Sequence, residues 1–260
     1  MSDHILVRHD GPIATVVLNR EKARNAITLG MYQRLPEVFT ELDQDPGIKV
    51  LVLRGAGERA FASGADIGEF ETVRANASDA KRYNEHVAAA EQALEAVSKP
   101  TIAMVHGYCI GGGCGLALAC DLRFADSRAK FGITPAKLGL VYSLESTKRL
   151  VDAIGAARAK WVLMSGQQVG AAQAERWGLA ELLGEPEELA EQTYEFAGLL
   201  AERAQYSVRA TKQIVGRILS GQTVDDEETT WLRNSSFDTD DYAEGVRAFL
   251  EKRAPVFTWS

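Results

Sequence analysis

The central stretch of the chain reads His106-Gly-Tyr-Cys-Ile-Gly-Gly-Gly-Cys-Gly-Leu-Ala-Leu-Ala-Cys-Asp121. It follows a strongly apolar run, Thr101 to Val105, and passes through three consecutive glycines into an Ala/Leu segment. The pattern predicts a buried strand, a glycine-rich turn and a buried helix. Such a turn leaves bare backbone N–H groups at a helix N-terminus, where they and the helix dipole attract negative charge. Tight packing of strand against helix would explain the glycines equally well.

Two familiar glycine motifs do not fit this turn. Gly111 to Leu118 lacks the G-x-G-x-x-G fingerprint of dinucleotide sites, and no Lys-Ser/Thr pair follows as in a P-loop. The pattern therefore disfavours a cradle for nucleotide phosphates. The remaining functional interpretation is that the amide of Gly112 holds a developing oxyanion, which requires a second donor from elsewhere in the chain.

Length and charge limit the classes of function. The 260 residues suit one large domain, or a domain with a smaller appendage, and the composition is ordinary for a globular enzyme. A formal net charge of −7 argues against a nucleic-acid-binding surface. The three cysteines all lie in the central apolar stretch, where buried reduced thiols are expected, and their spacing matches no zinc framework. We therefore expect no nucleic-acid partner, metal or redox cofactor.

The N-terminus carries no targeting pattern. Met1-Ser-Asp-His-Ile lacks the cationic and then apolar order of a signal peptide, and no apolar run approaches the roughly 20 residues of a membrane span. We therefore expect a cytoplasmic protein without a membrane partner.

The first third of the chain alternates strands with one helix. Ile5 to His9 and Ile13 to Leu18 flank Asp10-Gly11, which predicts an antiparallel hairpin. A helix with Thr28 as its N-cap is expected next, and Pro36 within its apolar pattern predicts a kink or a late start. The run Val50 to Leu53 is typical of a buried parallel strand.

A second strand, loop and helix unit follows. Phe61 to Ile67 is a Gly/Ala loop whose small residues permit close backbone approach. An amphipathic helix is then expected before Lys99-Pro100, with its apolar face formed by Tyr83, Val87, Ala90, Leu94 and Val97.

After Asp121, two short strands are expected at Leu122–Ala125 and Lys130–Ile133, and from Ser146 onward the signal is mainly helical. Ser207 is expected to cap one of the later helices. The other helices are expected at 156–165, 171–177, 187–204, 226–232 and 240–252. We expect an α/β core over residues 1–200 and a C-terminal helical region over 201–260.

Several motifs together resemble the crotonase (enoyl-CoA hydratase/isomerase) superfamily, in the family's order and over nearly the whole chain. They are Leu18-Asn-Arg-Glu-Lys-Ala-Arg-Asn-Ala26, Phe61-Ala-Ser-Gly-Ala-Asp66, Lys99-Pro-Thr-Ile-Ala103, Gly107-Tyr-Cys-Ile-Gly-Gly-Gly-Cys-Gly115, Cys120-Asp-Leu-Arg123 and Glu244-Gly-Val-Arg-Ala-Phe-Leu-Glu-Lys-Arg253. The resemblance implies a crotonase-like spiral of ββα repeats with a C-terminal helical oligomerisation region. It also implies a homotrimer or a dimer of trimers, and an acyl-CoA substrate with coenzyme A as part of that substrate rather than as a cofactor.

The same resemblance implies roles for individual residues. The backbone amides of Ser63 and Gly112 would form an oxyanion hole for a thioester carbonyl that becomes enolate-like in the transition state. Asp66 would border the CoA tail or cap a helix. Phe249 and Lys252 would meet the adenine and phosphate of CoA, often from a neighbouring subunit, or serve as a core aromatic and a solvated cation. The other positions implied to line the CoA tail and the acyl end are Arg24, Ala62, Gly64, Ala65, Ile67, Tyr108, Ile110, Gly111 and Pro135.

The chain departs from the hydratase pattern at two positions. Hydratases of this family place one glutamate two residues after the Gly-Gly-Gly run and a second four residues after the phenylalanine matching Phe131. These positions are Gly115 and Pro135 here. Hydration of an α,β-double bond needs a base for the water and an acid for the α-carbon, so the usual two-glutamate reaction is in doubt.

Glu145 is the first candidate to replace them. It lies in Gly139 to Thr147, a segment from which other superfamily members supply a carboxylate. A carboxylate facing the acyl pocket would be partly desolvated, with its pKa raised toward neutrality. Alternatively, Glu145 is solvated or caps a helix that begins near Ser146. His106 is expected to support a loop.

Three functions stay open at this point. The first is an acyl-CoA lyase or isomerase that uses the oxyanion hole and one unconventional acid/base. The second is a non-catalytic acyl-CoA-binding paralogue, which Gly115 and Pro135 favour. The third is a hydrolase, because the spiral fold also resembles that of Clp-type serine peptidases; it would need Ser63 beside a histidine and an acid.

Overall fold

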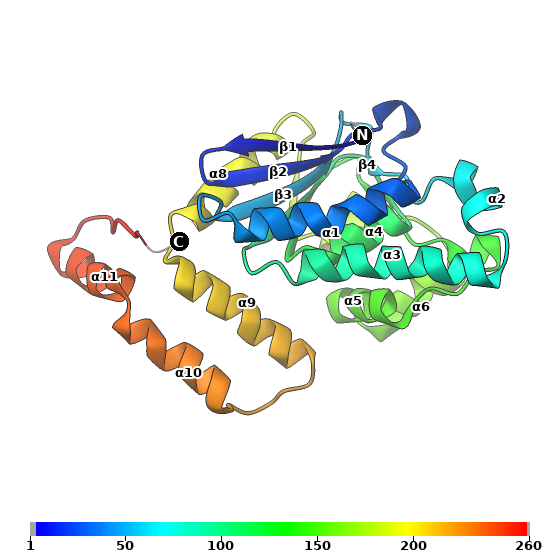
Figure 1. Cartoon of the computed structure of the whole chain (residues 1–260). Helices are drawn as coiled ribbons and strands as arrows, with labels where there is room; N and C mark the ends of the chain where they lie inside the picture. The colour runs from blue at the N-terminus through cyan, green and yellow to red at the C-terminus, as the bar shows by residue number, and fades with distance from the viewer. Residues whose placement is uncertain (1–3, 259–260) are drawn as a thin grey trace.

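The computed structural model arranges residues 4–258, the part of the chain that it describes, as two sheets covered by helices (Figure 1). The larger sheet has the strand order β1-β2-β3-β5-β7-β10 and the smaller sheet has the order β4-β6-β8-β9. The strands of the larger sheet are β1 (Ile5–Asp10), β2 (Ile13–Leu18), β3 (Val50–Gly55), β5 (Thr101–Val105), β7 (Leu122–Asp126) and β10 (Leu182–Gly184). Those of the smaller sheet are β4 (Ala60–Ala62), β6 (Tyr108–Ile110), β8 (Lys130–Gly132) and β9 (Val169–Gly170).

The strand pairing follows the sequence signals. β1 and β2 form the predicted antiparallel hairpin, with Ile5 opposite Leu18, and Gly11 supplies the positive φ of 53° in its turn. The pairs β2–β3, β3–β5, β5–β7 and β7–β10 are parallel. In the smaller sheet β4, β6 and β8 are parallel, and β9 joins β8 antiparallel.

Helices surround the sheets. They are α1 (Leu29–Gln44), α2 (Phe70–Val73), α3 (Ala77–Glu95), α4 (Gly112–Ala119), α5 (Leu144–Ile154), α6 (Ala156–Ser165), α7 (Ala171–Trp177), α8 (Leu189–Ala201), α9 (Gln205–Leu219), α10 (Glu227–Ser235) and α11 (Asp240–Glu251). Short 3₁₀ turns occur at η1 (Glu21–Ala23), η2 (Ile67–Glu69), η3 (Pro135–Leu138) and η4 (Ser236–Asp238).

The larger sheet is buried on both faces, which explains its nearly continuous apolar strands. In β3, Leu51 and Leu53 pack into the core shared with α1 and α3, whereas Val50 and Val52 pack against α8. Figure 1 shows α1 and α3 running together beneath β1–β3, and α8 on the other side. The mixed α/β architecture with a C-terminal group of helices confirms the predicted fold class.

One helix starts at the predicted N-cap and another does not. Helix α1 begins at Leu29, where the Thr28 hydroxyl accepts the Met31 amide at 3.2 Å, so Pro36 does not delay it. Burial of the apolar face of α1 outweighs the backbone hydrogen bond that Pro36 removes. Helix α9 begins at Gln205, and Ser207 therefore lies inside its first turn instead of capping it.

Helices α9, α10 and α11 extend away from the sheets in Figure 1. Their outward side chains include large apolar residues at Val215, Ile218, Trp231 and Phe249. Among the residues described, no helix is long and apolar enough to cross a membrane.

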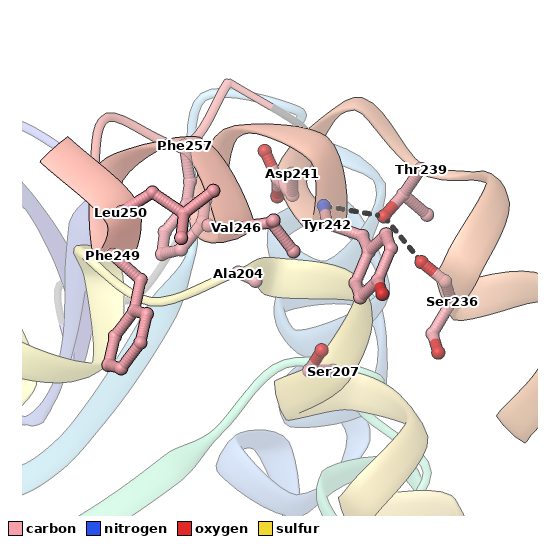
Figure 2. Close-up of a pocket in the computed structure, with 11 residues that line it drawn as sticks. Ala204, Ser207, Ser236, Thr239, Asp241, Tyr242, Val246, Phe249, Leu250 and Phe257 are labelled. Carbon is pink, nitrogen blue, oxygen red and sulfur yellow. Dashed lines mark hydrogen bonds between the residues drawn. The ribbon is translucent and has the colours of Figure 1, made fainter.

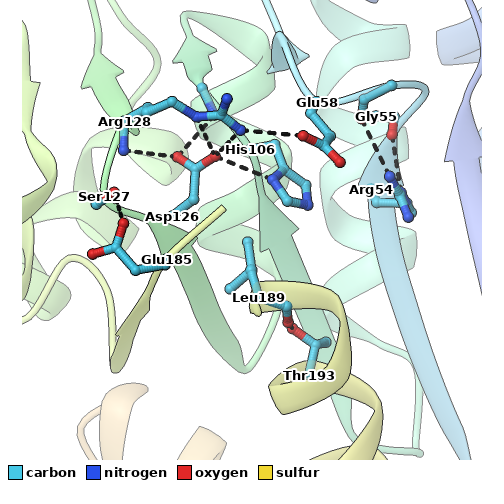
Figure 3. A network of polar contacts seen from close by, with 12 residues as sticks. Arg54, Gly55, Glu58, His106, Asp126, Ser127, Arg128, Glu185, Leu189 and Thr193 are labelled. Atoms are coloured by element: carbon cyan, nitrogen blue, oxygen red, sulfur yellow. Dashed lines mark hydrogen bonds and ion pairs between the residues drawn. The ribbon is translucent and has the colours of Figure 1, made fainter. Parts of the chain in front are cut away.

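A buried polar network fixes the turn between β5 and β6 (Figure 3). His106 Nδ1 lies 3.1 Å from a carboxylate oxygen of Asp126, the residue that ends β7, and the Gly107 amide donates to the same carboxylate at 3.3 Å. The Arg128 guanidinium pairs with Asp126 and reaches out to Glu58 at 3.3 Å. His106 thus supports a loop, as the sequence indicated.

The charge of Asp126 is held in place by these partners. Burial opposes its ionisation, but hydrogen bonds from His106, the Gly107 amide and Arg128 outweigh burial and lower the pKa of Asp126. A lowered pKa in the folded state contributes stability above the usual Asp range, and that contribution is lost as the pH falls through the folded pKa.

We expect Asp126→Asn to lower the free energy of unfolding by about 1–3 kcal/mol at neutral pH, because buried donors lose a charged acceptor. The loss should shrink at acid pH, where the wild-type carboxylate is itself protonated. Asp152→Asn is the control, since Asp152 pairs with Lys148 on the exposed face of α5 and should contribute less than about 1 kcal/mol. Urea denaturation at two pH values measures the free energy of unfolding of each variant. Equal decreases for Asp126→Asn and Asp152→Asn would contradict the role of the network.

Candidate active site

Two glycine loops meet at the ends of neighbouring strands. The loop after β4 contains Gly64, the loop after β6 contains Gly111, and these glycines have φ values of 104° and 55°. A Cβ placed on Gly111 would lie 3.7 Å from the Gly64 Cα, and one placed on Gly64 would lie 3.2 Å from the Ile110 carbonyl oxygen. The loops are thus in van der Waals contact, and their backbone conformation favours glycine.

The amide of Gly112 lies in the first turn of α4. Gly112 is the first residue of α4, whose N-cap Gly111 offers no side chain. In the described part of the chain its N–H donates no backbone hydrogen bond, as is usual for the first turn of a helix. This agrees with the predicted donor role, which remains a prediction.

The amide of Ser63, by contrast, is already engaged. It donates to the Arg24 carbonyl at 3.0 Å, and the Ser63 hydroxyl lies 3.3 Å from the Ala23 carbonyl. The prediction that the Ser63 amide is a free donor is therefore wrong. The next two amides, those of Gly64 and Ala65, donate no backbone hydrogen bond among the described residues. The parallel bridge with Ile27 uses the Gly64 carbonyl and the Asp66 amide and leaves the Ala65 N–H bare.

Two other loop residues have structural roles. Ala62 is fully buried and packs against Gly113, so it supports the loop and offers no surface to CoA, contrary to the expectation. Asp66 binds Arg20 at 2.7 Å and caps η2 through the Gly68 amide. The hydrogen bond from Arg20 outweighs partial burial and lowers the pKa of Asp66. The helix-cap interpretation of Asp66 is thus the one that these contacts support.

Two cationic side chains lie near the ring of Tyr108. The Arg24 guanidinium and the Lys130 ammonium each lie 5.7 Å from the ring centroid. Ile67 is largely exposed, and Pro135 begins η3. Except for Arg24, which follows η1, these positions lie on the loops and turns that follow the strands of the smaller sheet, or on β6 and β8 themselves.

Phe249 and Lys252 lie far from these loops within the chain. Both belong to the end of α11, which Figure 1 places at the opposite extremity of the molecule from α2. Phe249 lines an open cavity of about 380 Å³ between α9 and α11, together with Tyr242 and Leu250 (Figure 2). A contact between these residues and a ligand on the glycine loops would therefore require a second copy of the chain.

Glu145 occupies the first turn of α5, which begins at Leu144 under the N-cap Ser143 instead of near Ser146. Its carboxylate is exposed and accepts a hydrogen bond from Gln92 at 3.0 Å. The partial desolvation that we expected of Glu145 is therefore absent in this chain.

A different carboxylate lies beside the glycine turn. Glu91 of α3 is only 1% exposed, and a Cβ placed on Gly115 would fall far inside contact distance of its Oε1 atom. Gly115 is therefore needed to accommodate Glu91. The sequence contained a signal for the burial of Glu91. This residue lies four residues after Val87, on the same helical face as the apolar residues of α3.

Two tyrosines complete this corner. The Tyr32 hydroxyl occupies the position of a Cβ on Gly112, and the Tyr142 hydroxyl lies 3.1 Å from the position of a Cβ on Gly115. Burial raises the pKa of both hydroxyls well above the ordinary value, so both are neutral near pH 7. The first turn of α4 is thus surrounded by neutral hydroxyls and one buried carboxyl group.

Comparison with known proteins decides the family. The family model described as enoyl-CoA hydratase/isomerase matches residues 8–259. The chain belongs to the enoyl-CoA hydratase/isomerase family. It is 36% identical to a protein of Mycobacterium bovis named a probable enoyl-CoA hydratase, over 98% of this chain and 97% of that one. It is 32% identical to the crotonyl-CoA hydratase of Syntrophomonas wolfei, with 98% of both chains covered.

The solved structures agree. An enoyl-CoA hydratase/isomerase family protein from Hyphomonas neptunium superposes with a TM-score of 0.96 at 40% identity, covering 99% of this chain and 98% of that one. The chain therefore belongs to an enzyme family whose members act on acyl-CoA. The hydrolase alternative fails on geometry, because the Ser63 hydroxyl faces the Ala23 carbonyl while His106 pairs with Asp126, so no triad forms.

We expect Gly115→Ala to destabilise this enoyl-CoA hydratase/isomerase by about 1–3 kcal/mol, because the added methyl group overlaps the Glu91 carboxyl. Gly216→Ala on α9 is the matched control. A Cβ there meets nothing within 4 Å, so the change should stabilise by about 0.5–1 kcal/mol. Adding Glu91→Ala should remove most of the Gly115→Ala loss. Thermal melts of the variants test this, and a harmless Gly115→Ala would contradict the assigned packing.

Proposed function

We propose that this chain catalyses proton transfer at an acyl-CoA thioester, as an isomerase or a lyase, and holds the enolate oxygen between the amides of Ala65 and Gly112. One observation carries the proposal: two glycine loops touch each other and each presents a backbone N–H that has no acceptor among the described residues. Such paired donors stabilise a negative oxygen that develops in the transition state.

The chemistry follows from this arrangement. Removing a proton from the carbon beside a thioester carbonyl sends the electron pair onto the carbonyl oxygen. Donors about 2.7–3.1 Å from that oxygen stabilise it, and the loss of one donor typically costs 10²–10³ in rate. The dipole of α4, whose N-terminus is Gly112, adds to this stabilisation.

Hydration by two glutamates does not fit the proposal. Gly115 provides no side chain, and Pro135 provides a ring without an ionisable group. Each missing acid or base is worth roughly 10²–10⁴ in rate. Glu145, which the sequence favours as the proton carrier, is exposed in this chain, and its role stays a prediction.

The substrate end of the proposal rests on two features. The Arg24 carbonyl accepts the Ser63 amide, and Lys130, the first residue of β8, pairs with Tyr108 of β6. Both cations flank Tyr108 and suit the phosphates of a CoA tail. The exposed apolar side chains of α9–α11 support assembly as a homotrimer or a dimer of trimers, which would bring Phe249 of another copy toward the loops.

A second possible function is acyl-CoA binding without catalysis. It is favoured by Gly115 and Pro135, which stand where hydratases of this family have glutamates. If Gly115 and Pro135 remove all proton transfer, the chain binds acyl-CoA without turning it over. Measuring both binding and turnover separates the two functions. Each requires affinity for the acyl-CoA thioester, but only the catalytic function requires exchange of the α-protons.

We expect the wild-type protein to exchange the α-protons of a saturated acyl-CoA, butyryl-CoA, with deuterium from solvent, because the two amides stabilise the enolate. Hydration of crotonyl-CoA should be slower by at least roughly 10²-fold than in a two-glutamate hydratase measured in parallel. Mass spectrometry detects both reactions. Tight binding with neither reaction would favour the non-catalytic paralogue, and fast hydration would contradict the proposal.

A further inference from the structure

The carboxyl group of Glu91 is buried with its two oxygens in different environments. The Oε2 atom accepts hydrogen bonds from the Ser146 hydroxyl and from Arg149, each at 2.7 Å. The Oε1 atom is buried as well, but it has no hydrogen-bond partner among the described residues. This is the oxygen that points at Gly115.

Packing alone does not explain this position. A buried acceptor without a donor is unfavourable, and buried polar atoms in native proteins are almost always paired. The neighbouring helices α3 and α4 otherwise meet through apolar side chains such as Ala90, Leu94 and Leu116. Glycine at position 115 also lowers helix propensity, so the pair of Glu91 and Gly115 is poorly suited to stability.

The free oxygen lies beside Gly115, in the first turn of the helix that begins at Gly112. Gly112 and Gly115 are three residues apart, so they lie on one face of the helix, about 4.5 Å apart along its axis. A thioester oxygen held at the Gly112 amide would leave the carbon next to its carbonyl near this face. Glu91 Oε1 and the Tyr142 hydroxyl are the polar atoms found beside Gly115.

Resting on the proposed thioester chemistry, we propose that Glu91 is the catalytic acid/base of this enzyme and acts through Oε1. Oε1 takes a proton from the carbon next to the thioester carbonyl, and the C–H electron pair moves onto the carbonyl oxygen. The proton on Oε1 then returns to the same carbon, or to the γ-carbon of an unsaturated acyl group, as the carbonyl re-forms. No other reactant is consumed.

Ser146 and Arg149 are positioning residues in this scheme. They bind Oε2 and thereby aim Oε1 at α4, while Arg149 is itself held by Glu95 at 2.7 Å. Ser146, the residue next to Glu145, thus contacts the Glu91 carboxylate. A carboxylate from α3 takes the space that a glutamate at position 115 would otherwise need.

The environment of Glu91 determines its pH dependence. Burial raises the pKa of Glu91, while Ser146 and Arg149 oppose that rise and the nearby Glu145 adds to it. The hydroxyls of Tyr32 and Tyr142 also face this carboxyl and stay neutral. Because exchange requires the ionised base, its rate should rise with pH through a range above that of an ordinary glutamate.

The test is α-proton exchange of butyryl-CoA in deuterated buffer, with wild-type protein, Glu91→Gln and Glu145→Gln. Glutamine keeps the size of the side chain and removes the titrating group. We expect Glu91→Gln to lower the exchange rate at least roughly tenfold and to abolish the rise with pH, while calorimetric affinity for butyryl-CoA changes little. Glu145→Gln is the comparison variant for the competing assignment. It should keep the exchange reaction and its rise with pH, with the rise moved toward lower pH because a negative charge that raises the pKa of Glu91 is removed.

The other outcomes are equally distinct. Loss of exchange in Glu145→Gln with full exchange in Glu91→Gln would overturn the assignment and return the role to Glu145. A Glu91→Gln protein that melts earlier but exchanges normally, with the wild-type pH profile, would leave Glu91 a purely structural residue. Absence of exchange in the wild type, despite binding, would instead overturn the proposed function on which the assignment rests.

Discussion

The contact between the loops that carry Gly64 and Gly111 is the constraint on which the rest of this structure depends. Neither loop could carry a side chain at these glycines without strain, because both have positive φ and each approaches the other's backbone. The parallel pairing of β4 with β6 brings the loops together, and the His106–Asp126 network fixes the turn that leads into β6. The architecture thus brings the two glycine loops into contact, and the oxyanion site that we propose is built from backbone amides of these loops, without a catalytic side chain.

Oxyanion stabilisation and proton transfer, the two parts of the proposed chemistry, depend on different structural features. Stabilising an oxyanion depends on backbone geometry, which tolerates changes of side chain around it. Proton transfer depends on a positioned ionisable group, which can come from any element that reaches the substrate. Glycine at position 115 opens the space into which α3 places Glu91, with α5 holding the second oxygen of that carboxylate. In the mechanism that we propose, the fold keeps its oxyanion site while the proton carrier comes from a different helix.

Much of the fold could be predicted from local patterns, because alternation and helical periodicity mark the hairpin at Asp10-Gly11 and the glycine turn into α4. The engagement of the Ser63 amide could not be predicted in this way, because it depends on hydrogen bonds between segments 24–27 and 63–66. The same bonds leave the Gly64 and Ala65 amides without a backbone acceptor among the described residues. The role of Glu91 was missed for a similar reason: periodicity places it on the buried side of α3, but the gap at Gly115 appears only when α3 packs on α4. Phe249 and Lys252 depend on assembly, which a single chain does not specify.

The central claim is that Ala65 and Gly112 hold the thioester oxygen, and a crystal structure of the protein with a bound acyl-CoA tests it most directly. The account predicts that the thioester oxygen lies about 2.7–3.1 Å from both backbone nitrogens, with the Ser63 amide still donating to Arg24. A thioester oxygen bound to the Ser63 amide, or one that contacts neither loop, would contradict it.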